Sequence, residues 1–367
     1  MARVFIYIFT GEKMKKLTAV FLCAALLFCS GCGGIKKVPK QTRYQAEFLS
    51  LFDTITSLVG YAESKDDFTE ASNQFRDKLE EYHKLYTIYE DFEGINNIKT
   101  INDMAGIEPV KVDRRIIELL EYSKEQYKLS RGTFNIALGS VLEIWHEYRE
   151  TGINNPEEAQ LPPMELLKKA AEHTNIDDII IDVEASTVYL KDPLMRLDVG
   201  AVAKGYAVER VAEYMLELGI ENLLISVGGN VRAIGGKLGG KGETSPWVVG
   251  IKNPDSNSRQ AQLMSVSVKD LSVVSSGIYE RYYTVDGRQY HHIIDPETLM
   301  PSEHYAQVTI ICQDSGLADA LSTAAFIMPI DEAKSFINSM DGVEACWVLK
   351  SGEQIYSEGF EQAVPSF

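Results

Sequence analysis

The C-terminal half of the chain is dominated by short apolar runs rich in β-branched and aromatic residues. Each run is bounded by Gly, Pro, Asn or Asp, which is typical of strands. Within the fifth run, Asp286-Gly287 predicts a tight hairpin turn. Short strands that follow one another through turns favour antiparallel pairing. The six runs are 222–229, 247–254, 263–269, 271–277, 281–294 and 306–312.

Helical patterns interrupt these strands at irregular intervals. One strand is expected over 48–62. Helices are expected over 67–89, from an Asp113 cap to Gly132, from about Met164, and over 315–328 and 331–340, with a closing hairpin over 345–357. The segments 90–106 and 151–163 read as loops. Irregular interleaving of strands and helices predicts the α+β class, with largely antiparallel sheets layered with helices.

The N-terminus predicts a lipoprotein signal. From Met14 the sequence has two lysines, a short apolar run and then Ser30-Gly31-Cys32. Residues 1–13 fit no signal architecture, so we expect the true start at Met14. The expected organisation is a signal peptide over 1–31, a lipidated Cys32 at the head of a flexible tether over 32–45, and one domain over 46–367. The protein is then anchored by lipid to the outer face of the cytoplasmic membrane. An uncleaved membrane anchor is the alternative, and it gives the same extracytoplasmic address.

Charge and cysteine content exclude two classes of protein. The chain has 36 basic and 53 acidic residues, and the domain carries no basic cluster. Nucleic-acid binding is therefore not expected, because affinity for a phosphate backbone needs a basic face. Of the five cysteines only Cys312 and Cys346 belong to the domain, so a disulfide scaffold is excluded. These two cysteines could pair outside the cytoplasm, but nothing in the sequence requires it.

The stretch RLDVGAVAKGYAVERV, residues 196–211, raises a specific question. It reads as a strand over 196–199, a Gly turn and a helix to about Leu218, with Gly219 closing it. Lys204 falls in the first turn of that helix, where the partial positive charge of the helix disfavours a cation. The sequence thus raises the question of why a lysine stands there, six residues after Asp198.

Asp319 and Thr323 form a second notable pair. They are four residues apart in an apolar helix, so their side chains share one face. A buried carboxylate needs a partner, and a carboxylate with a hydroxyl suits Mg²⁺. The structural alternative is that Asp319 only favours a helix N-terminus while Thr323 bonds back to the carbonyl of residue 319. From the pair alone, the structural alternative is favoured.

Adjacent histidines and glycine-rich segments add weaker signals. His291 and His292 lie on a predicted strand, so only one of them can face a site. Without Cys or Glu at ligand spacing they are weak signals for zinc. The glycines of 226–230 could let backbone N–H groups approach a phosphate, and those of 235–242 are expected in hairpin turns.

Taken together, five motifs in this order closely resemble the ApbE family of FAD:protein FMN transferases. The resemblance spans roughly Leu51 to the C-terminus and implies an ApbE-like, T-fold-like architecture. The motifs are Asp198-Val-Gly-Ala-Val-Ala-Lys204-Gly, Ser226-Val-Gly-Gly-Asn230, Ser276-Gly-x-Tyr-Glu-Arg281, His292-Ile-Ile-Asp295-Pro and Ala318-Asp-Ala-Leu-Ser-Thr323.

The resemblance implies a role for each matching residue. The implied Mg²⁺ ligands are Asp319, Thr323 and the carbonyl of Ala201. His292 matches the residue proposed as general base in the family. Asp198 is the next candidate for that catalytic role. FAD-binding positions are Phe52, Tyr89, Thr133, Phe134, Asn135, Asp198, Lys204 and Ile293. Three positions depart from the family pattern: Phe52 where Met is usual, Asn135 where Asp is common, and Leu299 where Gly usually follows the Asp-Pro-Glu-Thr segment.

The implied activity is Mg²⁺-dependent transfer of FMN from FAD to a Thr or Ser hydroxyl of an exported or membrane redox protein, with release of AMP. Its partners would be FAD, that acceptor protein and the membrane through the lipid anchor. The alternatives are an FAD pyrophosphatase that yields FMN and AMP, a flavin-binding lipoprotein without turnover, and a purely structural lipoprotein. The intact Asp319/Thr323 pair and Lys204 argue against a flavin-binding lipoprotein, because pure binding does not need a metal site, and the set of motifs argues against a structural lipoprotein.

Overall fold

The computed structural model describes residues 41–239 and 243–363. The expected signal peptide 1–31 with Met14, the lipidation site Cys32 and most of the tether lie outside the described residues. The first strand, β1, begins at Thr42. The last four residues assigned to the tether, 42–45, are therefore part of the folded domain.

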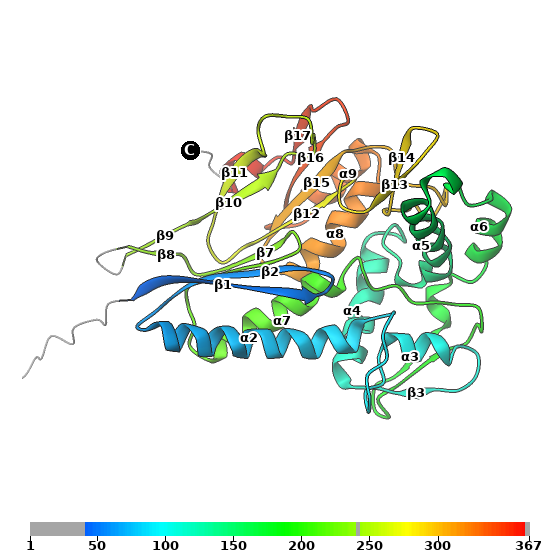
Figure 1. Cartoon of the computed structure of the whole chain (residues 1–367), viewed down its shortest axis with the longest axis horizontal. Helices are drawn as coiled ribbons and strands as arrows, with labels where there is room; N and C mark the ends of the chain where they lie inside the picture. Colours follow the sequence, from blue (N-terminus) through cyan, green and yellow to red (C-terminus); the bar gives the residue numbers. More distant parts are fainter. Residues whose placement is uncertain (1–40, 240–242, 364–367) are drawn as a thin grey trace, which may run out of the picture. The chain divides into compact units, whose positions relative to one another are not determined.

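A single eight-stranded sheet organises the domain, and every neighbouring pair in it is antiparallel. The strands run in the order β1-β2-β6-β7-β12-β15-β16-β17 (Figure 1). Their bounds are β1 Thr42–Leu51, β2 Thr54–Ala62, β6 Leu223–Val227, β7 Asn230–Ile234, β12 Ser272–Gly277, β15 Gln307–Cys312, β16 Glu344–Val348 and β17 Gln354–Tyr356. The predicted α+β class with antiparallel sheets is confirmed.

Smaller sheets flank the large one. Two of them are the hairpins β10–β11 and β13–β14, and the second turns at Asp286-Gly287 with positive φ at both residues, as predicted. Their bounds are β10 Trp247–Lys252, β11 Gln262–Val268, β13 Tyr282–Val285 and β14 Arg288–His291. The other short strands are β3 Val110–Lys111, β4 Ile179–Asp182, β5 Thr187–Leu190, β8 Lys237–Leu238 and β9 Thr244–Ser245.

The helices lie mainly on one face of the large sheet and at one end of it. In Figure 1, α2 and α7 run beside each other along the sheet, and α8 follows α7. The bounds are α2 Lys65–Tyr86, α3 Ile98–Asp103, α4 Arg114–Leu129, α5 Gly139–Asn154, α6 Met164–Ala171, α7 Ala203–Glu217, α8 Ser315–Ile327, α9 Ile330–Asn338 and α10 Phe360–Ala363. Single 3₁₀ turns occur at η1 Ile136–Leu138, η2 Pro156–Glu158 and η3 Ile176–Asp178.

Alternation along the central strands gives the sheet two buried faces. In β6, Leu223, Ile225 and Val227 pack against the helices. The other face is covered by the β10–β11 hairpin, which buries Trp247 and Val266 against it. A third apolar cluster joins α5 and α6 to the β13–β14 hairpin. The sheet and the helix layer therefore form one scaffold, with α5 held against its end.

The cysteines of the domain face opposite sides of the sheet. Cys312 packs into the core on the helix side, whereas Cys346 packs under the β10–β11 hairpin. Both are free and buried. Within the described part of the chain, no helix is long and apolar enough to cross a membrane.

Several sequence expectations need correction. The single strand expected over 48–62 is a hairpin of β1 and β2, because Phe52 and Asp53 both adopt positive φ and reverse the chain. The expected loop 90–106 contains α3, and residues 151–154 of the other expected loop end α5. The stretch 196–199 is not a regular strand.

Candidate active site

A cavity of about 380 Å³ opens between the start of α7, the middle of α8, α5 and the segment after β14. This volume lies in the range of small-molecule sites. All twelve residues predicted for catalysis, flavin binding or metal binding line it: Phe52, Tyr89, Thr133, Phe134, Asn135, Asp198, Ala201, Lys204, His292, Ile293, Asp319 and Thr323. They come from segments as far apart in the sequence as Phe52 and Thr323, and the fold brings them to one place.

At the floor of the cavity, Asp319 of α8 meets the first turn of α7. Its Oδ2 accepts a hydrogen bond of 2.8 Å from the Gly205 N–H. Asp319 is 4% exposed, and burial raises the pKa of its carboxyl, while Lys204 acts in the opposite direction. A negative side chain therefore lies at the helix start where Lys204 stands, which makes a cation there less unfavourable. The structural alternative for Asp319 is therefore correct in part. Asp319 does interact with a helix N-terminus, but with that of α7 instead of that of its own helix, α8.

Thr323 lies one turn further along α8 and faces the cavity. The back-bond to the carbonyl of residue 319 is made by Ser322 at 2.8 Å, instead of by Thr323. The hydroxyl of Thr323 has no hydrogen bond to any other residue that the structure describes. The structural alternative for Thr323 is therefore wrong, and its oxygen is available to a ligand.

Gly205 explains how α7 and α8 approach so closely. A Cβ at this position would lie 2.2 Å from the carbonyl oxygen of Ser315 and 2.5 Å from the Cβ of Asp319. Only glycine permits this contact, because both neighbouring atoms belong to the helix backbone or start a side chain. The glycine after Lys204 thus brings Asp319 to the start of α7.

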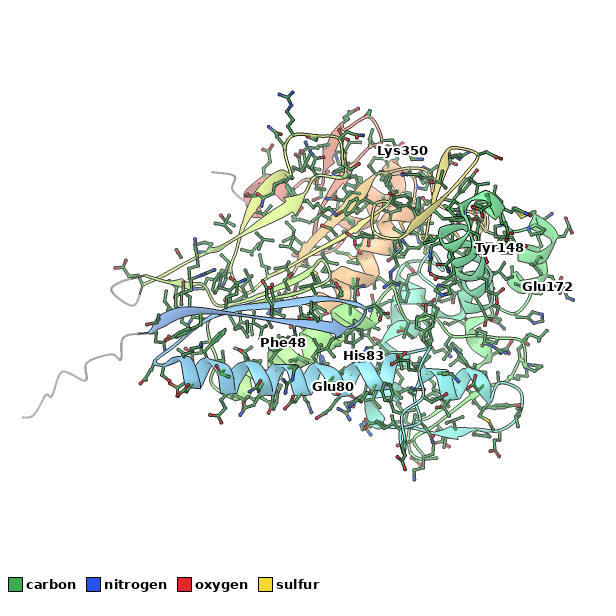
Figure 2. All side chains as sticks on the ribbon, in the orientation of Figure 1. Phe48, Glu80, His83, Tyr148, Glu172 and Lys350 are labelled. Carbon is green, nitrogen blue, oxygen red and sulfur yellow. The ribbon has the colours of Figure 1, made fainter. Side chains whose placement is uncertain are left out.

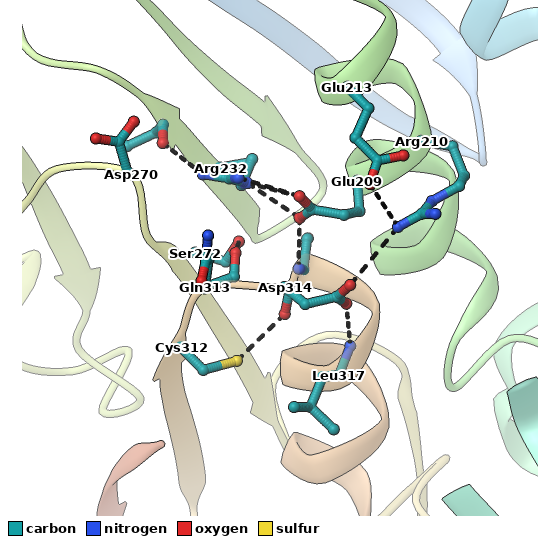
Figure 3. A network of polar contacts seen from close by, with 12 residues as sticks. Glu209, Arg210, Glu213, Arg232, Asp270, Ser272, Cys312, Gln313, Asp314 and Leu317 are labelled. Atoms are coloured by element: carbon teal, nitrogen blue, oxygen red, sulfur yellow. Dashed lines mark hydrogen bonds and ion pairs between the residues drawn. The ribbon is translucent and has the colours of Figure 1, made fainter. Parts of the chain in front are cut away.

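A buried ion pair fixes the same two helices further from the cavity (Figure 3). Arg232 of β7 pairs with Glu209 of α7, with Nε 3.0 Å from Oε2, and both side chains are less than 8% exposed. The same Oε2 accepts the N–H of Ser315 at 2.7 Å, at the start of α8. These contacts hold β7, α7 and α8 together. They therefore fix the separation of Lys204 on α7 from Asp319 and Thr323 on α8.

His292 lines the cavity, whereas its neighbour His291 points into the core. The Nδ1 of His292 lies 3.3 Å from the carbonyl oxygen of Arg281. Because a carbonyl can only accept, Nδ1 carries the proton in this contact, and Nε2 is left as an acceptor. Burial, with Arg281 and other nearby cations, lowers the pKa of His292 to about 3. The imidazole is thus neutral at pH 7, as a proton acceptor must be.

The buried His291 leads to a prediction about stability. Its Nε2–H donates to the Ser302 carbonyl at 2.8 Å and its Nδ1 accepts from the Ile293 N–H, so both nitrogens are satisfied in the neutral form. Burial lowers the pKa of His291 to about 4. The unfolded chain therefore binds a proton near pH 6.5 that the folded chain refuses, and stability falls as pH drops from 6.5 to 4.

We expect wild type to lose about 3 kcal/mol more of its free energy of unfolding than His291→Gln between pH 7 and pH 4. Urea denaturation at both pH values measures the difference. Equal losses in the two proteins would show that His291 does not cause the pH dependence.

An aromatic wall faces the polar floor. Phe52 is held in the β1–β2 turn, where its N–H donates to Nδ1 of His83 at 3.3 Å; His83, near the end of α2, is labelled in Figure 2. Tyr89 is 52% exposed and lies at the mouth beside His146, with ring centroids 5.5 Å apart. Burial of its phenol and the charge of Asp198 raise the pKa of Tyr89. Exposed and half-buried rings at a cavity mouth can stack on a planar ligand.

At two of the positions that depart from the family pattern, Asn135 and Leu299, the side chain makes contacts within the protein itself. The amide of Asn135 donates to the Thr174 carbonyl at 3.1 Å, and its Oδ1 caps the turn at Ala137. An aspartate could make only the second contact, so Asn135 is engaged with the protein itself. Leu299 has a φ of 62°, a conformation that favours glycine, but its buried side chain packs against α5 and its carbonyl accepts from Trp145.

The cavity residues that were not predicted as site residues include Arg149 and His146, both on α5, and Arg281. Arg281 had been recognised only as part of a motif. The first two were missed because no helix was predicted over residues 139–154. An amphipathic run with Val141, Trp145 and Leu138 on one side was the available signal.

The oxygens at the cavity floor fit a hard divalent cation. Asp319 offers a carboxylate, Thr323 a hydroxyl and Ala201 a backbone carbonyl, and all three residues line the same cavity. Asn230 is 1% exposed, and its Oδ1 has no hydrogen-bond partner among residues 41–239 and 243–363. An unpaired buried oxygen needs a partner. A carboxylate, a hydroxyl and a carbonyl are the oxygen ligands that suit Mg²⁺.

Comparison with known proteins places the chain in a family. The profile of the ApbE family matches residues 52–347. A protein of Klebsiella pneumoniae (strain 342) named FAD:protein FMN transferase is 31% identical over 279 residues, covering 75% of this chain and 83% of its own. A protein of the same name from Treponema pallidum (strain Nichols) is 33% identical over 262 residues, covering 69% and 70%.

Solved structures agree in fold. The ApbE protein of Thermotoga maritima superposes with a TM-score of 0.75 at 29% identity, covering 88% of this chain and 99% of its own. The flavin transferase ApbE from Vibrio cholerae has a TM-score of 0.71 at 22% identity, with the same coverage, and supports the fold alone. The predicted architecture is confirmed, and the chain belongs to the ApbE family.

Proposed function

We propose that this enzyme transfers FMN from FAD to a Thr or Ser hydroxyl of an exported or membrane redox protein and releases AMP. The observation that carries the proposal is the floor of the cavity, where Lys204, Asp319 and Thr323 meet beside the neutral His292. The relatives named FAD:protein FMN transferase support the same reaction class. Pure flavin binding would need the aromatic wall but not this polar floor.

Different residues of the cavity would bind different parts of FAD. Phe52 and Tyr89 offer rings to the flavin, and Lys204 offers a cation to the pyrophosphate. One N–H at the start of α7 already bonds to Asp319, so the lysine side chain carries more of this role than the helix start itself. Asp198 caps the turn before α7 through the Gly200 N–H at 2.8 Å, which orients that loop at the cavity.

Asp319, Thr323 and the carbonyl of Ala201 would hold Mg²⁺, with Asn230 as a further oxygen nearby. A bound Mg²⁺ supplies positive charge next to the pyrophosphate. The raised pKa of Asp319 means that its ionised form is costly in the empty cavity, and a cation offsets that cost.

His292 takes the proton of the acceptor hydroxyl. We expect His292→Ala to lower the rate of FMN transfer by about 10² to 10⁴-fold while leaving FAD affinity within a few fold, because a base acts on the acceptor and not on FAD binding. Single-turnover transfer followed by fluorescence of the labelled acceptor measures the rate. Full activity in His292→Ala would move the role of base to Asp198.

We also propose that the protein works outside the cytoplasm, held by lipid on Cys32 at the outer face of the cytoplasmic membrane. The signal pattern from Met14 and the polar segment after Cys32 support this location. A short tether of this kind would keep the cavity near membrane-bound acceptors.

A further inference from the structure

Arg149 is an unusual residue for a cavity wall. It lies on α5, is 9% exposed, and still lines the cavity. Among the residues that the structure describes, no carboxylate lies within ion-pair distance of its guanidinium. A buried charge without a partner is costly, so such a group is normally found with an anion.

The position of Arg149 is set by the protein and not by an opposite charge. Its Nη2 donates to Nδ1 of His146, one turn earlier on α5, at 2.5 Å. Burial and the charge of Arg149 lower the pKa of His146, so the imidazole is neutral and accepts. One of the five guanidinium N–H groups is used in this bond, which leaves a planar donor group for a ligand.

A second cation, Arg281, lies near Arg149 and lines the same cavity. Burial and the neighbouring Arg281 both lower the pKa of Arg149. Arg281 forms no ion pair with a described carboxylate either. Asp198 and Glu150 are near enough to favour the charged form, yet neither pairs with the guanidinium. The missing partner is therefore an anion that enters the cavity.

The location of this anion follows from His292. Arg149, Lys204 and His292 all line the same cavity, and both cations lower the pKa of His292. Lys204 stands with Asp319 on the α7–α8 side, while Arg149 approaches from α5. A phosphoryl group attacked by a hydroxyl that His292 deprotonates must lie next to His292, in the cavity that Arg149 also lines.

We propose that Arg149 binds the phosphoryl group of FAD that is transferred, opposite the side held by Lys204. The inference rests on the proposed function. The acceptor oxygen forms a bond to the FMN phosphorus, its proton goes to Nε2 of His292, and the bond from phosphorus to the bridging oxygen breaks. The bridging oxygen leaves with the electron pair as part of AMP. A planar guanidinium can bond two oxygens of the transferred group at once.

The test compares ligands with and without the phosphoryl group. Full-length wild type and Arg149→Gln are titrated with FAD, FMN and riboflavin in the presence of Mg²⁺, and binding is followed by flavin fluorescence. We expect Arg149→Gln to weaken FAD and FMN by about 10- to 100-fold, since a charge-assisted hydrogen bond is lost, and to change riboflavin less than about twofold. Arg259→Gln removes the same charge from an exposed loop and should change none of the three.

A second, more conservative variant keeps the inference testable if Arg149→Gln does not fold. Arg149→Lys keeps the charge but loses the planar pair of donors, and we expect FMN to weaken by about 3- to 10-fold. Unchanged FAD and FMN affinities in both variants overturn the inference. So does a variant with normal FAD affinity whose only defect is a raised KM for the acceptor, because Arg149 would then bind the acceptor protein. Failure of wild type to bind FAD at all would instead refute the proposed function.

Discussion

Asp319→Asn should reduce FMN transfer by about 10³-fold or more while the protein stays folded. The amide keeps the shape of the carboxylate, and its Oδ1 can still accept from the Gly205 N–H. It loses the negative charge that would hold Mg²⁺ next to the pyrophosphate, and electrostatic groups of this kind contribute several kcal/mol to a transition state. Transfer rates at saturating FAD, over a range of Mg²⁺ concentrations, measure the effect.

Stability provides the counter-test for this variant. Because burial raises the pKa of Asp319, its ionised form is costly in the metal-free protein. Metal-free Asp319→Asn should therefore unfold at a denaturant concentration equal to or above that of wild type. Asp331→Asn, on the exposed first turn of α9, is the matched control and should change neither property. Normal transfer by Asp319→Asn would remove Asp319 from the metal site.

Gly205→Ala should destabilise the fold by about 3 kcal/mol or more, although alanine is normally the better helix residue. The added methyl group would overlap the Ser315 carbonyl at 2.2 Å and push α8 away from α7. The displacement would also move Asp319 away from Lys204, so the remaining folded protein should transfer FMN slowly. Thermal or urea unfolding and the transfer assay measure the two effects.

Gly316→Ala is the control for this substitution. It adds the same methyl group at the same contact between α7 and α8, but the nearest atoms would be 3.1 Å away on the Asp314 side chain and 3.2 Å away at the Tyr206 Cα, well beyond the 2.2 Å at Gly205. We expect its free energy of unfolding to change by about 1 kcal/mol or less. If Gly205→Ala is as mild as Gly316→Ala, the two helices are not in fixed contact at Gly205.

The residues of the site could be predicted from sequence because the set of motifs that carries them resembles the ApbE family, whereas no single motif was decisive. Lys204 in a first helical turn, and Asp319 with Thr323 in an apolar helix, each break a local rule, and the fold brings them to one cavity. The α+β class followed from local strand and turn signals. The hydrogen bond between Asp319 and the Gly205 N–H at the start of α7 could not be predicted from the sequence, because it joins residues more than 100 positions apart.

The missed parts have physical reasons. Phe52 and Asp53 reverse the chain with positive φ, which neither residue type signals, so β1 and β2 looked like one strand. The helix α5 begins at Gly139 without a side-chain cap, and it carries Arg149 and His146. With no cap signal the helix was overlooked, and its two cavity residues were overlooked with it.

The central claim is that this cavity moves FMN from FAD to a protein hydroxyl. Its most direct test is to incubate the full-length protein with FAD, Mg²⁺ and a candidate acceptor protein, and to measure both AMP and covalent flavin fluorescence on the acceptor. We predict equal amounts of AMP and labelled acceptor, and neither product with Asp319→Asn. AMP without labelled protein would mean that the enzyme hydrolyses FAD, and the absence of both products from wild type would contradict an activity on FAD altogether.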